Sequence, residues 1–248
     1  MILTKDVELI EGMPVAFIRS INAIVIADLH LGYEAMLAKN GLFAPAINLK
    51  KILEIIGSAL EKTKAKNVII DGDIKNEFSR VEPEEFNELY ELISFLKKKN
   101  VSLHLIKGNH DNFVERYKDQ FKLNVYRQQA KIGKYLFFHG EELPKYENND
   151  KIEMLVMGHE HPSIGINDNL GRREKLKCFL YGSYDSKKLL VLPAISFYAS
   201  GTDLLLEPTE HLLSPVFRHI NIDKMHAIAI GYGSTIDFGS LSKLKAVH

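Results

Sequence analysis

The chain has 248 residues, and its 32 Lys and Arg side chains balance 32 Asp and Glu side chains, so no global field favours nucleic acid or an anionic membrane. Its length and its 46% hydrophobic content are typical of a globular chain that buries a sizeable core. The single Cys178 excludes an internal disulfide framework, and the lack of a signal peptide or of a span-length apolar run predicts a cytoplasmic protein without a membrane partner.

The first predicted elements are short strands. Two of them, joined by a turn, are expected over residues 7–18, and the apolar run 23–27 is typical of a buried strand. This run is followed by Asp28 and His30, which project to the same side of an extended backbone and can therefore reach one ion together. Taken alone, the pair is better explained as a surface Asp near an unrelated His.

A strand-helix-strand unit is predicted next. The segment 31–45 is ambiguous between a broken helix and a loop, whereas apolar residues recur at helical spacing over 46–64. A strand over 67–71 then leads to Asp73. Because a right-handed crossover brings the ends of two parallel strands to one edge of the sheet, we expect Asp73 to lie beside Asp28.

A second amphipathic helix, beginning at Pro83, and a strand over 101–106 complete a βαβαβ pattern. The strand leads to Asn109, His110 and Asp111, which offer an amide oxygen, an imidazole and a carboxylate in consecutive positions. Open α/β sheets bind their ligands at this end of the strands. On its own the motif would be interpreted as a polar turn.

The second half of the chain is rich in short strands, expected over 123–126, 135–138, 152–157, 176–181 and 188–192. His139 follows one of these strands, and His159 and His161 follow another. Five of the ten histidines now lie just past apolar strands (His30, His110, His139, His159 and His161). A structural histidine is the simpler interpretation for any one of them, but the set indicates metal binding.

Two basic segments are less informative. The lysines at 97–99 are interpreted as the solvated end of a helix rather than as a binding patch. The loop 167–175, with Arg172, Arg173 and Lys175, is interpreted as a charged hairpin, with contact to a phosphate or nucleobase as the alternative.

Together these motifs resemble the five ordered blocks of the calcineurin-like metallophosphoesterase superfamily: Asp28-x-His30, Gly72-Asp73, Gly108-Asn109-His110-Asp111, His139 and Gly158-His159-x-His161. Segments around 192–194 and 201–203 are also similar to archaeal phosphoesterases akin to bacterial DNA-ligase-associated metallophosphoesterases. The resemblance implies an α/β (α+β) fold, a four-layer αββα sandwich of two mixed β-sheets flanked by helices. We expect one domain over 1–248, with 200–248 as a packed extension of the second sheet.

The resemblance also implies a binuclear metal site. Asp28, His30 and His161 would bind one divalent ion, Asn109, His139 and His159 would bind the second, and Asp73 would bridge the two. An anionic bridge fits the repulsion between ions about 3.5 to 4 Å apart. Manganese is the expected metal, and iron, zinc, cobalt or nickel can occupy such a mixed N and O ligand set.

The implied activity is hydrolysis of a phosphodiester or phosphomonoester of a small-molecule or nucleotide substrate by a metal-bridging hydroxide. His110 would stabilise charge or protonate the leaving oxygen, with Asp111 as an orienting partner. The alternatives are a nuclease of the same superfamily and a non-catalytic scaffold, and the complete ligand set argues against the scaffold. The residue types at 74–77, just after Asp73, differ from the pattern of many members of the family that the motifs resemble, which leaves the substrate preference open. The sequence does not predict an oligomeric state.

Overall fold

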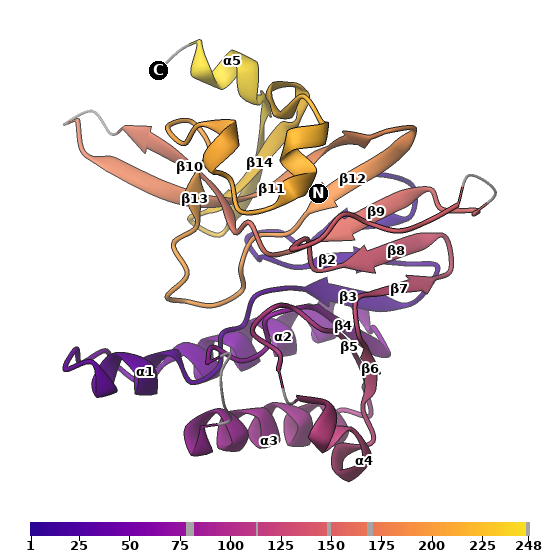
Figure 1. Ribbon diagram of the computed structural model, residues 1–248, viewed down its shortest axis with the longest axis vertical. Helices are drawn as coiled ribbons and strands as arrows, with labels where there is room; N and C mark the ends of the chain where they lie inside the picture. Colours follow the sequence, from indigo (N-terminus) through magenta and orange to yellow (C-terminus); the bar gives the residue numbers. More distant parts are fainter. Residues whose placement is uncertain (78–81, 113, 148–149, 168–170, 247–248) are drawn as a thin grey trace.

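A computed structural model describes residues 1–77, 82–112, 114–147, 150–167 and 171–246. Two mixed β-sheets lie face to face, one from each half of the chain, with the long helices below the first sheet and the C-terminal segments above the second (Figure 1). The predicted fold class, α/β with two mixed sheets and flanking helices, is therefore confirmed.

The first sheet has six strands in the order β1-β2-β3-β4-β5-β6 among the described residues. The first three are antiparallel to one another and the last four run parallel, which makes the sheet mixed. Their bounds are β1 Val7–Leu9, β2 Ala16–Ile18, β3 Ala23–Ile26, β4 Asn67–Asp71, β5 Ser102–Ile106 and β6 Asn124–Tyr126. The pairs Ile26 with Ile70 and Asp71 with Ile106 align the carboxyl ends of β3, β4 and β5.

Two amphipathic helices, α2 (Asn48–Thr63) and α3 (Pro83–Lys98), cover the outer face of this sheet. Residues such as Ile52 and Leu92 pack against the outward side chains of the strands, as the helical spacing predicted. α3 begins with a capping box between Glu82 and Glu85, and it ends in lysines that complement the helix dipole. The segment left ambiguous by the sequence contains α1 (Tyr33–Lys39), and η1 (Val114–Tyr117) and α4 (Lys118–Phe121) follow β5.

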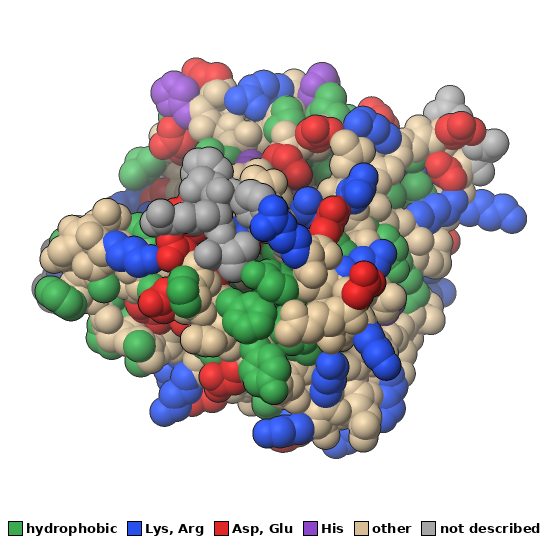
Figure 2. Space-filling model, turned by 60° about the horizontal axis from the view of Figure 1, so that its bottom comes forward, with side chains coloured by type: hydrophobic (Ala, Val, Ile, Leu, Met, Phe, Trp, Pro, Cys, Tyr) green, Lys and Arg blue, Asp and Glu red, His purple; other side chains and the backbone are tan. Residues whose placement is uncertain are grey.

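A groove of about 660 Å³ lies between α2 and α3. Apolar residues, among them Leu53 and Phe95, line it together with several glutamates, among them Glu34 and Glu88. The face that comes forward in Figure 2 shows a group of hydrophobic side chains near its middle and charged side chains around it.

The second sheet has nine strands among the described residues, with β13-β10-β11-β12-β9-β8-β7 as its main path and β14 and β15 joined to β11. Strands β8, β9 and β12 run parallel, and the other neighbours are mostly antiparallel. The bounds are β7 Gln129–Ile132, β8 Tyr135–Phe138, β9 Met154–Met157, β10 Pro162–Asn167, β11 Arg173–Tyr184, β12 Lys187–Val191, β13 Thr202–Asp203, β14 His226–Gly231 and β15 Ser234–Ser240.

The C-terminal stretch adds the β14-β15 hairpin to this second sheet, and its short helices pack on the outer face of the sheet. It consists of η2 (Thr209–His211), η3 (Pro215–His219), η4 (Ile222–Lys224), the β14-β15 hairpin and α5 (Leu241–Lys245). Phe217 and Met225 join Cys178 and Leu180 of β11 in one buried cluster. A separate cluster, with Val25, Ile69 and Phe179, fills the space between the two sheets. None of the described helices is both long and apolar enough to cross a membrane.

Candidate metal centre

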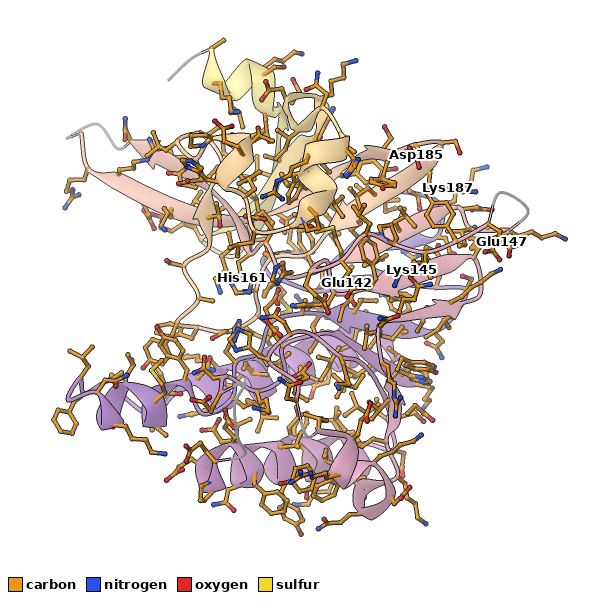
Figure 3. The ribbon with its side chains drawn as sticks, viewed as in Figure 1. Glu142, Lys145, Glu147, His161, Asp185 and Lys187 are labelled. Carbon is orange, nitrogen blue, oxygen red and sulfur yellow. The ribbon has the colours of Figure 1, made fainter. Side chains whose placement is uncertain are left out.

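Polar side chains from both sheets converge where their parallel strands end. Asp28 and His30 follow β3, Asp73 follows β4, His139 follows β8, and His159 and His161 follow β9. Figure 3 places His161 near the middle of the molecule, between the helices of the first half and the strands of the second. The residues singled out in the sequence thus lie at one edge of each sheet, and the facing of the two sheets brings the two edges together.

Two groups of side chains could each hold a metal ion. One consists of Asp28, His30, Asp73 and His161, and the other consists of Asp73, His139 and His159. Within each group the ligand atoms lie within 4.8 Å of one another, and Asp73 belongs to both.

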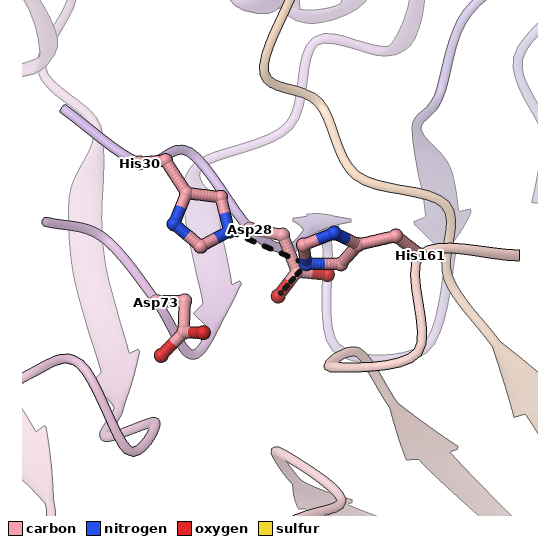
Figure 4. Close-up of side chains that lie close together, drawn as sticks. All are labelled: Asp28, His30, Asp73 and His161. Atoms are coloured by element: carbon pink, nitrogen blue, oxygen red, sulfur yellow. Dashed lines mark hydrogen bonds and ion pairs between the residues drawn. The ribbon is translucent and has the colours of Figure 1, made fainter. Parts of the chain in front are cut away.

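The contacts within the groups are short, and one of them brings two imidazole nitrogens together. Nε2 of His161 lies 3.2 Å from Oδ1 of Asp28 and 3.3 Å from Nε2 of His30, and Figure 4 shows these two contacts beside the Asp73 carboxylate. Nε2 of His139 lies 3.2 Å from Oδ2 of Asp73. Nitrogens and oxygens of separate ligands that face one shared point in this way are typical of a cation site.

Five of the ligand residues have a backbone conformation that residues other than glycine rarely adopt. Asp28, His30, Asp73, His159 and His161 have positive φ angles of 58°, 47°, 50°, 67° and 48°. A left-handed conformation in a residue other than glycine costs on the order of 1 to 3 kcal/mol, and it persists where surrounding contacts enforce it. One such contact is the amide of His159, which donates to Oδ1 and Oδ2 of Asp28 at 3.2 Å.

The nitrogens of His139 have different surroundings. Nδ1 lies 2.9 Å from the Asp71 carbonyl, to which it donates, so Nε2 is directed toward Asp73. Within the described part of the chain, this buried Nε2 and the buried Nδ1 of His30 have no hydrogen-bond partner. A carbonyl that fixes the tautomer of a histidine is the usual support of a metal ligand.

The charges at the site are compatible with cation binding. Burial, and the charge of a neighbouring histidine, lower the pKa of His30 and of His159 to about 4, so both imidazoles keep a lone pair at neutral pH. Burial raises the pKa of Asp73, but the histidines around it lower the pKa further, and the carboxylate is therefore ionised. Burial lowers the pKa of His139 and of His161, but the neighbouring carboxylates of Asp73 and Asp28 raise it further, so these two imidazoles would release a proton when a divalent ion binds. Ionised carboxylates and the neutral imidazoles of His30 and His159 are already in the forms that bind divalent ions.

His110 lies at the edge of the two groups. Its backbone amide donates to Oδ1 of Asp73 at 3.0 Å, and its Nε2 is 4.0 Å from Oδ2 of the same residue. Its Nδ1 is hydrogen-bonded to the carbonyl oxygen of Asn76. Asn76 takes part through its backbone carbonyl, which no pattern of side chains in the sequence could have indicated.

Asp111 and Asn109 are placed differently from each other. Asp111 is buried, and its carboxylate accepts hydrogen bonds from the amides of Gly108 and Ile74, both at 2.9 Å, and of Lys75 at 3.3 Å. These contacts fix the two loops that carry Asp73 and His110, whereas the sequence suggested Asp111 as the partner that orients the His110 ring. Asn109 is an exposed residue of the same turn.

Two contributions to the site were missed from the sequence. Asp71 is buried beneath it, and within the described residues neither of its carboxylate oxygens has a hydrogen-bond partner. Glu160, between the two histidines after β9, accepts a hydrogen bond from the amide of Ser214 at 3.0 Å and thereby ties the C-terminal stretch to this loop. Only the position of Glu160 within the motif could have drawn attention to it.

The basic segment expected as a loop over 167–175 is partly strand, because Arg173 and Lys175 belong to β11, and both have partners. Arg173 pairs with Asp203 at 2.7 Å, and Nζ of Lys175 donates to the Gly201 carbonyl at 2.9 Å. Residues 168–170 of this loop lie outside the described residues.

The family model of the calcineurin-like phosphoesterases matches residues 21–173 of the chain. The crystal structure of the Pseudomonas putida nuclease MPE has a similar fold, with a TM-score of 0.62 and 16% identity over 92% of this chain and 93% of that chain. The E. coli phosphoesterase Yfce is 18% identical over 86% of this chain and 96% of that chain, with a TM-score of 0.39. No curated protein sequence matches the chain significantly. Because the family model spans more than half of the chain, this protein belongs to the calcineurin-like phosphoesterase family.

Proposed function

We propose that this protein is a phosphoesterase with two divalent metal ions, which hydrolyses a phosphodiester or phosphomonoester bond of a small-molecule or nucleotide substrate. The observation that carries the proposal is the pair of ligand groups that share Asp73. A carboxylate that belongs to both groups is suited to hold two cations that would otherwise repel each other. We propose the cytoplasm as its compartment.

The residues would divide between the two ions as follows. Asp28, His30 and His161 would hold one, and Asn109, His139 and His159 would hold the other, with Asp73 between them. Bound divalent ions would polarise the phosphate oxygens and lower the pKa of a water molecule. Manganese suits the mixed nitrogen and oxygen donors, and iron, zinc, cobalt or nickel would suit them as well.

His110 would act on the substrate rather than on the metals. The Asn76 carbonyl holds its Nδ1, so Nε2 points toward the Asp73 side of the site, where an ester would bind. From there a protonated imidazole can donate to the leaving oxygen or stabilise negative charge on the phosphate. Asp111 would support this geometry by fixing the loop backbones.

A nuclease is the second candidate, because the P. putida protein with which this chain shares its fold is a nuclease. The two activities need the same metal chemistry and differ in the size of the group on the phosphate. The balanced charge of the chain does not itself indicate a nucleic-acid surface.

A panel of nitrophenyl monoesters and diesters, cyclic nucleotides and single-stranded DNA, assayed with manganese, tests both candidates. We expect turnover of at least one class in the wild-type protein. In Asp73→Asn we expect loss of turnover together with reduced manganese content, because the shared carboxylate is gone. Two metals per chain and unchanged turnover in this variant would contradict the binuclear assignment.

A further inference from the structure

Three aromatic side chains gather beside the metal centre. The rings of Tyr33, in α1, and Tyr198 are stacked, with their centroids 5.6 Å apart and their planes at 16°. Phe197 packs edge-on against Tyr198, with a centroid distance of 5.2 Å and an angle of 87°. The side chain of Phe197 is nevertheless 54% exposed.

Backbone hydrogen bonds place this aromatic group next to the ligands that follow β3. The amide of Ser196 donates to the carbonyl of Asp28 at 3.1 Å, and Phe197 is the next residue. The amide of Tyr33 donates to the carbonyl of His30 at 3.3 Å. Because consecutive Cα atoms are about 3.8 Å apart, the backbone of Phe197 lies close to the backbone of Asp28.

The backbone of this segment is held at several points. The amide of Phe197 donates to Oδ1 of the buried Asn48 at 2.8 Å, and Nδ2 of Asn48 donates to the Leu29 carbonyl at 3.0 Å. Nζ of Lys177 donates to the carbonyls of Ala194, at 2.8 Å, and of Ser196. An exposed apolar residue is ordinary by itself, but a ring on a fixed backbone loses little conformational freedom when a ligand covers it.

We propose that Phe197 is the surface on which the base of a nucleotide substrate stacks while its phosphate occupies the metal centre. This inference rests on the proposed phosphoesterase function and specifies its substrate class. Every nucleobase has a flat π face, and stacking on an aromatic side chain is a common source of affinity for single-stranded nucleotides. The chain has no net charge, so stacking would supply affinity that does not depend on counterion release.

The test compares adenosine 5′-monophosphate with ribose 5-phosphate, which lacks the base, as competing ligands in manganese-dependent hydrolysis of a nitrophenyl ester. In the wild-type protein we expect the adenosine compound to inhibit at about 5- to 100-fold lower concentration. In Phe197→Ala and Phe197→Leu this ratio should fall close to one, while the inhibition constant of ribose 5-phosphate stays the same. Phe197→Trp should retain the ratio.

Tyr90→Ala is the matched control, because Tyr90 of α3 is 56% exposed and also packs against another aromatic ring, that of Phe121. It should retain the wild-type ratio. A ratio near one in the wild-type protein, or an undiminished ratio in Phe197→Ala, would overturn the inference. If Phe197→Leu keeps the wild-type ratio of inhibition constants, the contact is a general apolar one, and stacking is rejected. If Phe197→Ala weakens the binding of both ligands equally, Phe197 has a structural role, and stacking is rejected as well. Absence of turnover in the wild-type protein would instead refute the proposed function, and the stacking role with it.

Discussion

Replacing Gly108 by alanine would add one methyl group at the centre of the site. A Cβ atom there would lie 2.2 Å from Oδ1 of Asp73 and 2.8 Å from Cδ2 of His139, whereas ordinary contacts begin at 3.4 Å. The Asp73 carboxylate would therefore have to move by about 1 Å, and metal ligands tolerate displacements of only about 0.2 Å. We expect manganese affinity to fall roughly 10- to 100-fold and turnover to fall by about 10² or more.

The assay measures manganese per chain after equilibration at fixed free metal, kcat on a phosphodiester, and thermal unfolding of the metal-free protein. Gly57→Ala is the control, because a Cβ atom at this position in α2 meets its nearest neighbour, Cζ of Phe95, at 3.4 Å. The control should keep full activity and gain about 0.5 to 1 kcal/mol of stability, since alanine suits a helix interior better than glycine. Full metal content and turnover in Gly108→Ala would refute the reasoning, because Asp73 could then not lie where the metals bind.

Three further predictions concern other parts of the molecule. If His110 protonates the leaving oxygen, His110→Asn should reduce kcat by about 10² to 10⁴ on esters with poor alkoxide leaving groups and much less on nitrophenyl esters. Equal losses of kcat on both kinds of ester, at unchanged metal content, would reject that role. Burial, with nearby carboxylates, raises the pKa of Glu88 to about 7 from 4.5, so ionisation destabilises the fold as pH rises through this window. The side chain of Gln in Glu88→Gln can still accept the hydrogen bond from the Gly32 amide. In urea unfolding we therefore expect this variant to be more stable than wild type by about 1 to 2 kcal/mol at pH 8, a value that allows for the partial exposure of Glu88, and equally stable near pH 4. We also propose that residues 200–248 belong to the same domain as the rest, so limited proteolysis should not release a stable active core that ends near Gly201.

Much of the first half could be predicted from the sequence, because its elements have strong local signals. The helix expected over 46–64 is α2, and the strand expected over 101–106 is β5. Parallel strands with helical crossovers have few possible arrangements, so the convergence of Asp28 and Asp73 at one edge also followed from the sequence.

The second half was less predictable, because its strands pair with distant partners. Two strands were not expected at all: β10, which pairs antiparallel with β11, and β15, which pairs with β14. β11 also runs well beyond the strand expected over 176–181. The aromatic group at Phe197 was also missed, since it depends on the buried Asn48 side chain, 149 positions away in the chain. Such contacts are set by tertiary packing and leave no periodic signal.

Because the ligand residues have a left-handed backbone conformation, thermal stability favours glycine at these positions, whereas hydrolysis requires the ligand side chains. Glycine at His30 or His159 would relieve an unfavourable conformation and would remove a ligand at the same time. A mutant library selected for heat resistance without metal should therefore collect glycines at these positions and lose its activity. The same selection in excess manganese should keep the histidines, because ions that bind only the folded state add their binding free energy to its stability.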